Sequence, residues 1–263
     1  MKPAPELSLV IPCFNEEEVV EYALRELAGA FAEAGHDLTL FAVDNGSTDR
    51  TGEILARLSE EGLPIEVVRV AKNEGYGNGV LQGIAAARGA WIGMIPADGQ
   101  VDASDVVRLF EVLVSSPRPM LGKVRRRFRM DGFRRKVMSV AYNVFVYCLW
   151  PRLGTIDVNG SPKIVPANYL RAMEIQSRRW FLDPEIMIKA RDLDLPVLEM
   201  NVFARMRSAG VSHVRVGTCW EFFTKLIAYR LGGPLKNWRK RLASGAIVDP
   251  RNASSTRLEG TRA

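Results

Sequence analysis

A short acidic turn follows an apolar run in the first half of the chain. Asp98 and Gln100 come directly after the apolar segment Ala90–Ile95. A carboxylate just past a buried strand lies where an open α/β sheet binds its ligands. Carboxylate and amide oxygens suit a hard cation such as Mg²⁺ or Mn²⁺, which in turn suits a pyrophosphate. The turn therefore predicts a metal site, with Asp98 and Gln100 as ligands, that holds a nucleotide diphosphate.

A second polar turn begins at Asp44, which ends the apolar run Leu38–Val43 and opens the sequence DNGSTDRT. A carboxylate at this point can accept hydrogen bonds from a base or a ribose. The same residue types also suit an Asx-turn and a helix N-cap. We predict a nucleotide-binding role for Asp44 and a structural capping role for Asp49.

A glycine-rich turn, Asn73 to Gly79 (NEGYGNG), follows the next apolar run. Its spacing is not G-x-G-x-x-G, and no ribose-binding acid follows a strand about 20 residues later, so a dinucleotide site is a weak interpretation. Glycines at this density are a feature of loops whose backbone must approach a neighbouring group closely. We therefore predict a loop that needs such an approach.

Apolar runs and amphipathic segments alternate through the first half. This βαβαβαβα pattern predicts a parallel sheet with helices on both faces, which places the three turns at one edge of the sheet. The predicted strands are Leu7–Ile11 (ended by Pro12), Leu38–Val43, Ile65–Val70 and Ala90–Ile95, and the predicted helices are one from Glu16 capped by Asn15, Thr51–Leu58, Gly79–Ala87 and Ala103–Val114.

The second half is less regular. The basic segment Lys123–Lys136 and the stretch Val137–Trp150 are typical of one or two amphipathic helices. The polar tail from Asp249 is typical of disorder. Between them we predict strand and loop over Asp157–Val165, a helix from Asp183 to Ala190, a strand over Val197–Met206 and a helix over Trp220–Leu231.

Composition sets broad limits. The 263 residues are 47% hydrophobic and 25% charged, which favours one large α/β domain with a basic appendage. Three dispersed cysteines fit a reducing cytosol, and two histidines argue against a His-based metal site or a Ser-His-Asp triad. The apolar stretch Val137–Trp150 would extend roughly 21 Å as a helix, too short to span a bilayer of about 30 Å but long enough to lie on one.

The positive charge is concentrated. Lys123–Lys136 carries eight Lys or Arg and one Asp, a local charge of +7 in a chain of net +6, and Lys236–Arg241 adds four more basic residues. The first cluster could meet anionic lipid headgroups and an acceptor phosphate, bind nucleic acid through the interleaved Phe128 and Phe133, or form a solvated loop. The apolar stripe that follows it favours the lipid interpretation, with no nucleic-acid partner.

These segments together resemble family 2 glycosyltransferases of the GT-A fold, in the branch of dolichol-phosphate mannose synthase and polyprenyl-phosphate glycosyltransferases. The resemblance rests on seven segments in the family's order: SLVIPCFNEEE, VDNGSTDRT, KNEGYGNGVLQGIAAARGAWIGMIPADGQVD, FRRKVMSVAYNVFVY, DVNGSPKIV, WFLDPEIMIKAR and RMRSAGVSH. It implies a mostly parallel sheet with helices on both faces, followed by C-terminal amphipathic helices. The expected domain is 1–235, with a nucleotide-sugar half at 1–115, an acceptor half at 116–235 that includes the segment 123–150, and a basic, partly disordered tail at 236–263.

The resemblance also implies an activity and site residues. It implies Mg²⁺- or Mn²⁺-dependent transfer of a sugar from a GDP- or UDP-linked donor to a polyprenyl phosphate, by a peripheral protein at the cytoplasmic membrane surface. Pro96 replaces the first carboxylate of the family's metal turn, so one ligand is missing. The implied catalytic residues are Asp98, Asp157 and Arg207; the donor contacts are Pro12, Asn15, Glu16, Asp44, Asn73, Gly75, Gly77, Asp98 and Arg207; the acceptor contacts are Arg125, Arg127, Arg135, Asn159, Lys163, Asp183 and Glu185.

Two other functions remain open. The loop Gly160–Pro162 departs from the family pattern, which keeps a soluble small-molecule or glycan acceptor possible. Pro96 keeps open a non-catalytic nucleotide-sugar-binding subunit. Gln176–Trp180 spells the Q-x-x-R-W of processive polysaccharide synthases. Those proteins surround the motif with transmembrane helices, so we interpret this match as coincidence.

Overall fold

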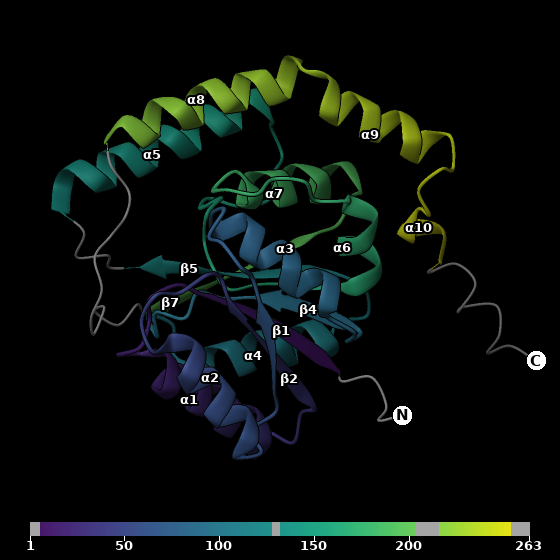
Figure 1. Ribbon diagram of the computed structural model, residues 1–263. Helices are drawn as coiled ribbons and strands as arrows, with labels where there is room; N and C mark the ends of the chain where they lie inside the picture. The colour runs from purple at the N-terminus through teal and green to yellow at the C-terminus, as the bar shows by residue number, and fades with distance from the viewer. Residues whose placement is uncertain (1–5, 128–131, 204–215, 254–263) are drawn as a thin grey trace, which may run out of the picture.

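The computed structural model describes the backbone of residues 6–127, 132–203 and 216–253 and the side chains of 6–125, 140–203 and 223–252. A seven-stranded sheet lies at its centre, with the strand order β3-β2-β1-β4-β6-β5-β7 (Figure 1). The strands are β1 Leu7–Cys13, β2 Leu38–Asp44, β3 Ile65–Arg69, β4 Trp91–Met94, β5 Leu121–Arg127, β6 Lys163–Pro166 and β7 Val197–Phe203.

Six of the seven strands run in the same direction, because β6 is antiparallel to both β4 and β5 while the other pairs are parallel. The carboxyl ends of β1, β2, β4 and β5 therefore lie at one edge of the sheet, together with the start of β6. The strand order reverses beside β1, where β2 lies on one side and β4 on the other. Such a reversal creates the crevice in which open α/β sheets bind ligands.

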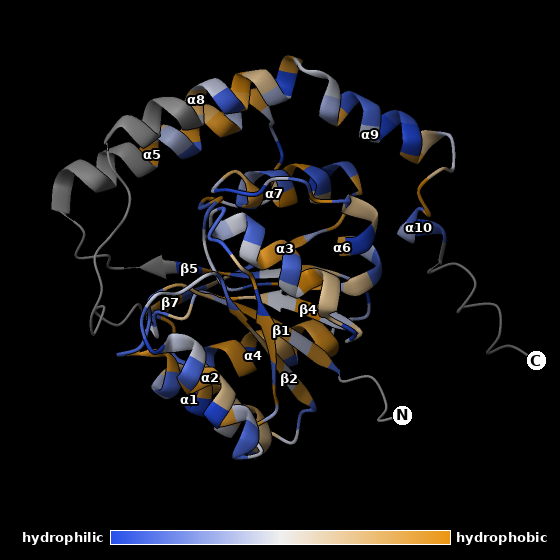
Figure 2. Ribbon diagram, viewed as in Figure 1, coloured by the Kyte–Doolittle hydropathy of each residue, from blue (hydrophilic) through white to orange (hydrophobic). Residues whose placement is uncertain are grey.

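The sheet is covered on both faces because its strands bury alternate residues on opposite sides. Leu9 and Ile11 face α1 (Val20–Glu33), α2 (Thr51–Glu60) and α4 (Ala103–Val114). Val10 and Val43 face α3 (Tyr76–Ala86), α6 (Ala167–Met173) and α7 (Leu182–Asp192). Figure 2 shows the strands as a largely hydrophobic layer between these helices. The predicted parallel sheet with helices on both faces is confirmed for the first half.

An outer helical layer lies beyond α7 (Figure 1). It is formed by α5 (Gly132–Leu149) and α8 (Val216–Leu231), which lie side by side, followed by α9 (Gly233–Ala243). The short α10 (Pro250–Ala253) lies beside α6. The rings of Phe145 and Phe223 meet edge to face between α5 and α8, with centroids 4.9 Å apart. No helix within the described ranges is long and apolar enough to cross a membrane.

The predicted start of the first helix was wrong. Strand β1 continues through Pro12 to Cys13, and α1 begins at Val20. Asn15 has φ of 55°, and its Oδ1 accepts the Thr48 N–H at 2.8 Å. Its side chain is therefore used to hold the loop after β2, and it does not cap α1.

The helical prediction for the basic segment was also wrong over residues 123–127, which belong to β5, while 132–149 form α5. Lys123 is fully buried, and Arg125 is half-buried. The basic residues made this strand look like an exposed segment. Lys123 can be buried in the strand because it is paired with a carboxylate. In the tail, α10 adds a short helix at Pro250–Ala253 to the segment predicted to be disordered, and residues 254–263 lie outside the described part.

Helix α3 packs unusually close to the sheet at Gly83. A Cβ at this position would collide with Val10 Cγ1 and lie 3.0 Å from Val43 Cγ2, both in the buried core. We expect Gly83→Ala to lower the free energy of unfolding by about 1–3 kcal/mol through overpacking. Urea unfolding measures the change.

Gly29 is the matched control, since it also lies within a helix but has nothing within 4 Å of the added Cβ. Gly29→Ala should raise the stability by roughly 0.5–1 kcal/mol through helix propensity alone. Equal effects of the two substitutions would contradict the close packing of α3.

Candidate active site

The predicted donor residues gather where the carboxyl ends of β1, β2 and β4 meet. Pro12 lies near the end of β1, Asp44 ends β2, and Asp98 follows β4. Backbone hydrogen bonds tie the segments together, from Asn45 N to Cys13 O at 2.9 Å and from Ile95 N to Val10 O at 3.0 Å. These turns lie at one edge of the sheet, as the sequence predicted, and beside the reversal of strand order.

Asn45 joins the second turn to the glycine-rich turn. Its Nδ2 donates to Gly75 O at 3.1 Å and to Asn73 Oδ1 at 3.3 Å. The residue is 2% exposed, and its buried Oδ1 has no hydrogen-bond partner among the described residues. Next to it, Asp44 Oδ1 accepts the Ser47 N–H at 3.0 Å. The pair thus fixes two turns at one point of the sheet edge.

The glycine-rich turn uses its residues mainly to shape the backbone. Asn73 Oδ1 accepts the Gly75 N–H at 2.8 Å, and Gly75 has φ of 113°, which favours glycine. A Cβ on Gly77 would lie 2.5 Å from the carbonyl oxygens of both Ser177 and Arg179. The predicted close approach is present, and the partner at Gly77 is a protein backbone. Nucleotide contacts of these residues stay a prediction.

The loop after β1 is held by side chains of the loop after β2. Glu16 N donates to Thr51 Oγ1 at 2.9 Å, and Asp49 accepts the N–H groups of Glu17 at 3.1 Å and Thr51 at 3.0 Å. The structural role predicted for Asp49 is confirmed. Burial, followed by the carboxylates of Glu16 and Asp44, raises the pKa of the Cys13 thiol above its usual range. Cys13, at the end of β1, therefore lies near the carboxylates of both Glu16 and Asp44.

The acidic turn contributes few donors for a metal. Gln100 N donates to Asp98 Oδ1 at 3.2 Å, and Pro96 has no side-chain oxygen. In the described part of the chain, no three His, Cys, Asp or Glu side chains cluster as a metal site. One carboxylate and one amide fit Mg²⁺ when substrate phosphates and water supply the remaining ligands. The donor set thus suits an ion shared with a diphosphate.

The predicted acceptor loop lies at the same edge, because β6 runs against its neighbours and starts there. Ser161 Oγ donates to Met94 O at 3.3 Å, which attaches the loop to the end of β4 just before the acidic turn. Asp157 is half-buried and Asn159 is exposed. The fold therefore brings the predicted base into the same region as Asp98.

A buried lysine, missed from the sequence, pins this loop. Lys123 Nζ donates to Thr155 Oγ1 at 2.9 Å and to the carbonyl oxygen of Asp157, and it pairs with Glu199 Oε2 at 3.2 Å. Burial acts to raise the pKa of the Glu199 carboxyl. The Lys123 ammonium and the hydrogen bond from Thr155 outweigh this effect and hold the pKa of Glu199 below its usual value. The network joins β5, β7 and the loop before β6.

Three residues predicted to contact the acceptor are buried and paired with charges of opposite sign. Lys163 is fully buried, pairs with Asp183, and donates to Gly160 O at 2.8 Å. Glu185 is 2% exposed and pairs with Lys189 at 2.7 Å. Each of these charges has a buried partner of opposite sign, and contact with an acceptor stays a prediction. The four-residue spacing of Glu185 and Lys189 was the signal that could have indicated their pairing.

Four predicted arginines remain. Arg125 lies on β5 opposite Asn201 of β7 and is half-buried. The side chains of Arg127 and Arg135 and the whole of Arg207 lie outside the described part of the structure. Their predicted contacts with acceptor and donor stay predictions.

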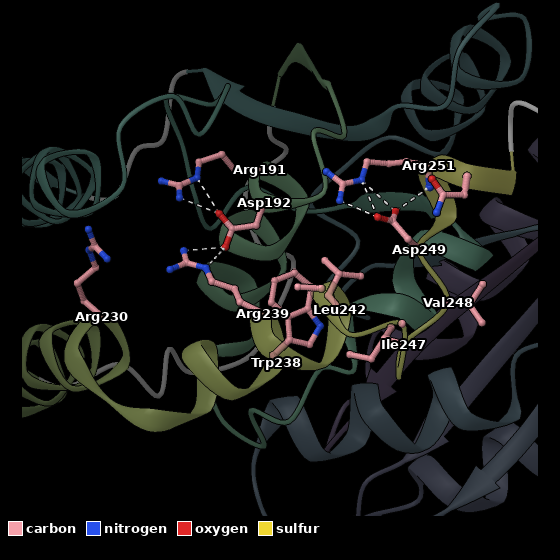
Figure 3. A pocket seen from close by; sticks show the side chains of 13 residues that line it. Arg191, Asp192, Arg230, Trp238, Arg239, Leu242, Ile247, Val248, Asp249 and Arg251 are labelled. Carbon is pink, nitrogen blue, oxygen red and sulfur yellow. Dashed lines mark hydrogen bonds and ion pairs between the residues drawn. The ribbon is translucent and has the colours of Figure 1, made fainter.

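A separate pocket of about 1030 Å³ lies between α7, α9 and α10, and none of the predicted site residues within the described ranges lines it (Figure 3). Asp192 accepts hydrogen bonds from Arg191 at 2.7 Å and from Arg239 at 2.8 Å, and Arg251 pairs with Asp249 at 2.7 Å. Arg191 and Arg239 thus share the carboxylate of Asp192, while Arg251 pairs with both Asp194 and Asp249. We assign no ligand to this pocket.

Burial, followed by the nearby Lys163 ammonium, lowers the pKa of Lys123 from 10.5 to about 8. Below pH 8 both the folded and the unfolded chain keep this proton, so the cost of burying the charge is fully present. Between these two pKa values the unfolded chain binds more proton, so the contribution of Lys123 to stability rises with pH, by at most about 1.4 kcal/mol per pH unit.

We therefore expect the stability difference between wild type and Lys123→Met to shift in favour of wild type as the pH rises from about 7 to about 9.5. Urea unfolding at each pH measures it, with Lys236→Met on the exposed face of α9 as the control. The same pH dependence for wild type and Lys123→Met would rule out the lowered pKa.

Three curated relatives are similar in sequence. A dodecaprenyl-phosphate galacturonate synthase of Rhizobium johnstonii is 35% identical over 54% of this chain and 42% of its own length. A dolichyl-phosphate beta-glucosyltransferase of Dictyostelium discoideum is 24% identical over 74% and 65%. An undecaprenyl-phosphate 4-deoxy-4-formamido-L-arabinose transferase of Pseudomonas aeruginosa is 29% identical over 78% and 57%. The chain spans roughly half the length of these relatives.

Solved structures share the fold, which confirms the expected GT-A architecture. Glucosyl-3-phosphoglycerate synthase from Mycobacterium tuberculosis, in complex with Mn²⁺, UDP and glucosyl-3-phosphoglycerate, superposes with a TM-score of 0.69 at 20% identity over 88% of this chain and 81% of that one. The family model for glycosyl transferase family 2 matches residues 8–181, which include the loops after β1, β2 and β4. The chain therefore belongs to glycosyl transferase family 2.

Proposed function

We propose that this protein transfers a sugar from a nucleotide diphosphate sugar to a polyprenyl phosphate at the cytoplasmic surface of a membrane. The observation that carries the proposal is the meeting of the Asp44–Asn45, Asn73–Gly75 and Asp98–Gln100 turns at the reversal of strand order. This arrangement suits a donor that presents a nucleoside to one turn and a diphosphate to another. The named activities of the three sequence relatives support the acceptor class.

In the proposed mechanism, Asp44 binds the nucleoside and Asp98 with Gln100 would hold Mg²⁺ or Mn²⁺. When bound, this ion would neutralise charge on the diphosphate leaving group. Arg207 is proposed to add a guanidinium to the same diphosphate. A phosphate acceptor is already ionised near neutral pH and needs little general-base help. Asp157 would serve as base for a hydroxyl acceptor.

The membrane proposal rests on exposed apolar stripes in the outer helical layer. On α5, Val140 and Val144 are each 57% exposed, and they lie one helical turn apart. On α8, Ile227 is 43% and Leu231 is 82% exposed, again one turn apart. The opposite sides of both helices are buried in the same core. Both stripes therefore point away from the body of the protein.

Basic residues accompany these stripes. Between residues 223 and 245 the chain has six Lys or Arg and no Asp or Glu, and α9 is largely hydrophilic in Figure 2. Apolar side chains beside a segment rich in Lys and Arg are typical of an interfacial helix on an anionic bilayer. The proposed membrane contact thus includes α5, α8 and α9.

The donor site predicts the effect of Asp98. Asp98→Asn removes the charge that would balance the ion, so we expect kcat to fall at least about 10²-fold while the fold survives. The assay is nucleoside diphosphate release from UDP- and GDP-sugars with Mg²⁺ or Mn²⁺, with and without polyprenyl phosphate in detergent.

Asp102→Asn is the control, because Asp102 accepts the Ser104 N–H as the N-cap of α4 and asparagine caps equally well. Release that requires the lipid supports the polyprenyl acceptor, and release without it favours a soluble acceptor. Full activity of Asp98→Asn would refute the metal role. No release by wild type from any donor would favour a non-catalytic binding protein.

The outer layer predicts lipid binding. We expect wild type to bind vesicles of phosphatidylglycerol and phosphatidylcholine, more weakly as salt increases. The double variant Val144→Glu, Leu231→Glu should bind at least about 10-fold more weakly, since it removes apolar insertion and adds negative charge. Vesicle co-sedimentation measures the affinity.

Val112→Glu is the matched control, because Val112 is 43% exposed on α4, on the other face of the sheet. It should bind vesicles as wild type does. An equal loss for both variants, or binding insensitive to salt, would argue against α5 and α8 as the membrane face.

A further inference from the structure

Helix α7 carries a buried ion pair that takes no part in the proposed mechanism. Glu185 and Lys189 lie four residues apart, with Oε1 and Nζ separated by 2.7 Å and side chains 2% and 3% exposed. Two charges buried this deeply need further polar partners, because an incompletely satisfied pair costs several kcal/mol. Those partners show what the pair is for.

Backbone groups of one neighbouring segment satisfy the pair. Glu185 Oε2 accepts the N–H groups of Gln176 at 3.2 Å and Ser177 at 2.9 Å. Lys189 Nζ donates to the carbonyl oxygen of Glu174 at 3.1 Å and lies 5.3 Å from the centroid of the Trp238 ring on α9. The pair therefore fixes the path of residues 174–177 from both sides.

The chain that follows this fixed segment passes directly over the first turn of α3. Arg178 O accepts the Asn78 N–H at 2.7 Å. A Cβ at Gly77 would lie 2.5 Å from the carbonyl oxygens of Ser177 and Arg179, so backbone meets backbone without intervening side chains. A contact this close transmits the position of one segment to the other.

Side chains extend the same contact. The rings of Tyr76 and Trp180 stack with centroids 5.3 Å apart and planes 8° from parallel. Arg178 Nη1 lies 2.9 Å from Glu74 Oε2. The glycine-rich turn thus contacts residues 177–180 on one side and Asn45, at the end of β2, on the other.

We propose that Glu185 is a positioning residue that sets the Asn73–Gly79 turn through the backbone of residues 176–179. The proposal rests on the proposed function only in treating this turn as part of the donor site. Gln176 and Ser177 take part through their amides, so the likeness of this segment to Q-x-x-R-W plays no role. A carboxylate is required because one group must accept two amides and balance an ammonium.

The first test compares Glu185→Gln with Asp192→Asn. Asp192 is also a carboxylate of α7, with a side chain 10% exposed, and it pairs with Arg191 and Arg239 away from the turn (Figure 3). Amide hydrogen exchange over residues 73–79 should be at least about 10-fold faster in Glu185→Gln and unchanged in Asp192→Asn. Circular dichroism checks that both variants fold.

The second test reads the donor site. UDP and GDP with Mn²⁺ serve as probes by calorimetry, and Glu185→Gln should weaken the affinity of whichever binds wild type by roughly 10-fold. Gly77→Ala disturbs the same backbone contact from the α3 side, because the added Cβ would collide with the carbonyl oxygens of Ser177 and Arg179, and it leaves Glu185 unchanged. It should speed exchange at residues 176–178 and weaken the nucleotide affinity in the same way.

The outcomes separate the two proposals. Wild-type exchange and nucleotide affinity in Glu185→Gln would overturn the positioning role. Faster exchange over residues 73–79 in a protein that binds neither nucleotide would support positioning of the turn and reject the donor site. Equal effects of Glu185→Gln and Asp192→Asn would reduce Glu185 to general stabilisation of α7 and overturn the proposal.

Discussion

The close approach of α3 to the sheet determines the geometry of the candidate site. Gly83 allows the helix to lie against Val10 and Val43, and Gly79 allows its first turns to lie against Asn45 and Pro12. A helix pressed to the sheet at these two points has little freedom to shift along it. The Asn73–Gly79 turn therefore starts from a fixed position beside the end of β2, where Asn45 donates to Gly75 O.

Buried lysines order the other half of the site. Lys123 and Lys163 lie opposite each other on β5 and β6, and both donate to carbonyl oxygens of the Asp157–Gly160 loop. Each ammonium has its own carboxylate, Glu199 and Asp183. Both halves of the domain have an apolar core, and the second half adds these buried charge pairs to it. Breaking a buried pair leaves an uncompensated charge, so this half tolerates few substitutions at these positions.

The sequence predicted the elements of the first half well because their apolar residues recur at regular intervals. Segments such as Leu38–Val43 and Ala103–Val114 follow the simple periods of a strand or an amphipathic helix, and the structure places elements there. The edge that holds Asp44 and Asp98 followed from the order of those elements. The helix start predicted at Asn15 was wrong because asparagine, although it often caps helices, here accepts a hydrogen bond from the distant Thr48.

The second half could not be predicted from periodicity. A strand written LGKVRRR looks polar, and nothing local reveals that Lys123 is buried by Glu199 and Thr155 from distant segments. The same holds for Glu185, whose partners Gln176 and Ser177 become visible only once α7 is placed beside the loop. Long-range charge pairing leaves no pattern along the chain.

The place of β5 in the sheet has a consequence for biosynthesis. Its neighbours are β6 and β7, and both come later in the chain. As the polypeptide leaves the ribosome, β5 stays unpaired while about 35 further residues are made before β6 appears. An unpaired apolar strand would invite aggregation, whereas lysine and arginine oppose edge-to-edge association. The basic residues of β5 thus act as gatekeepers during synthesis, before some of the same charges are enclosed in the finished sheet.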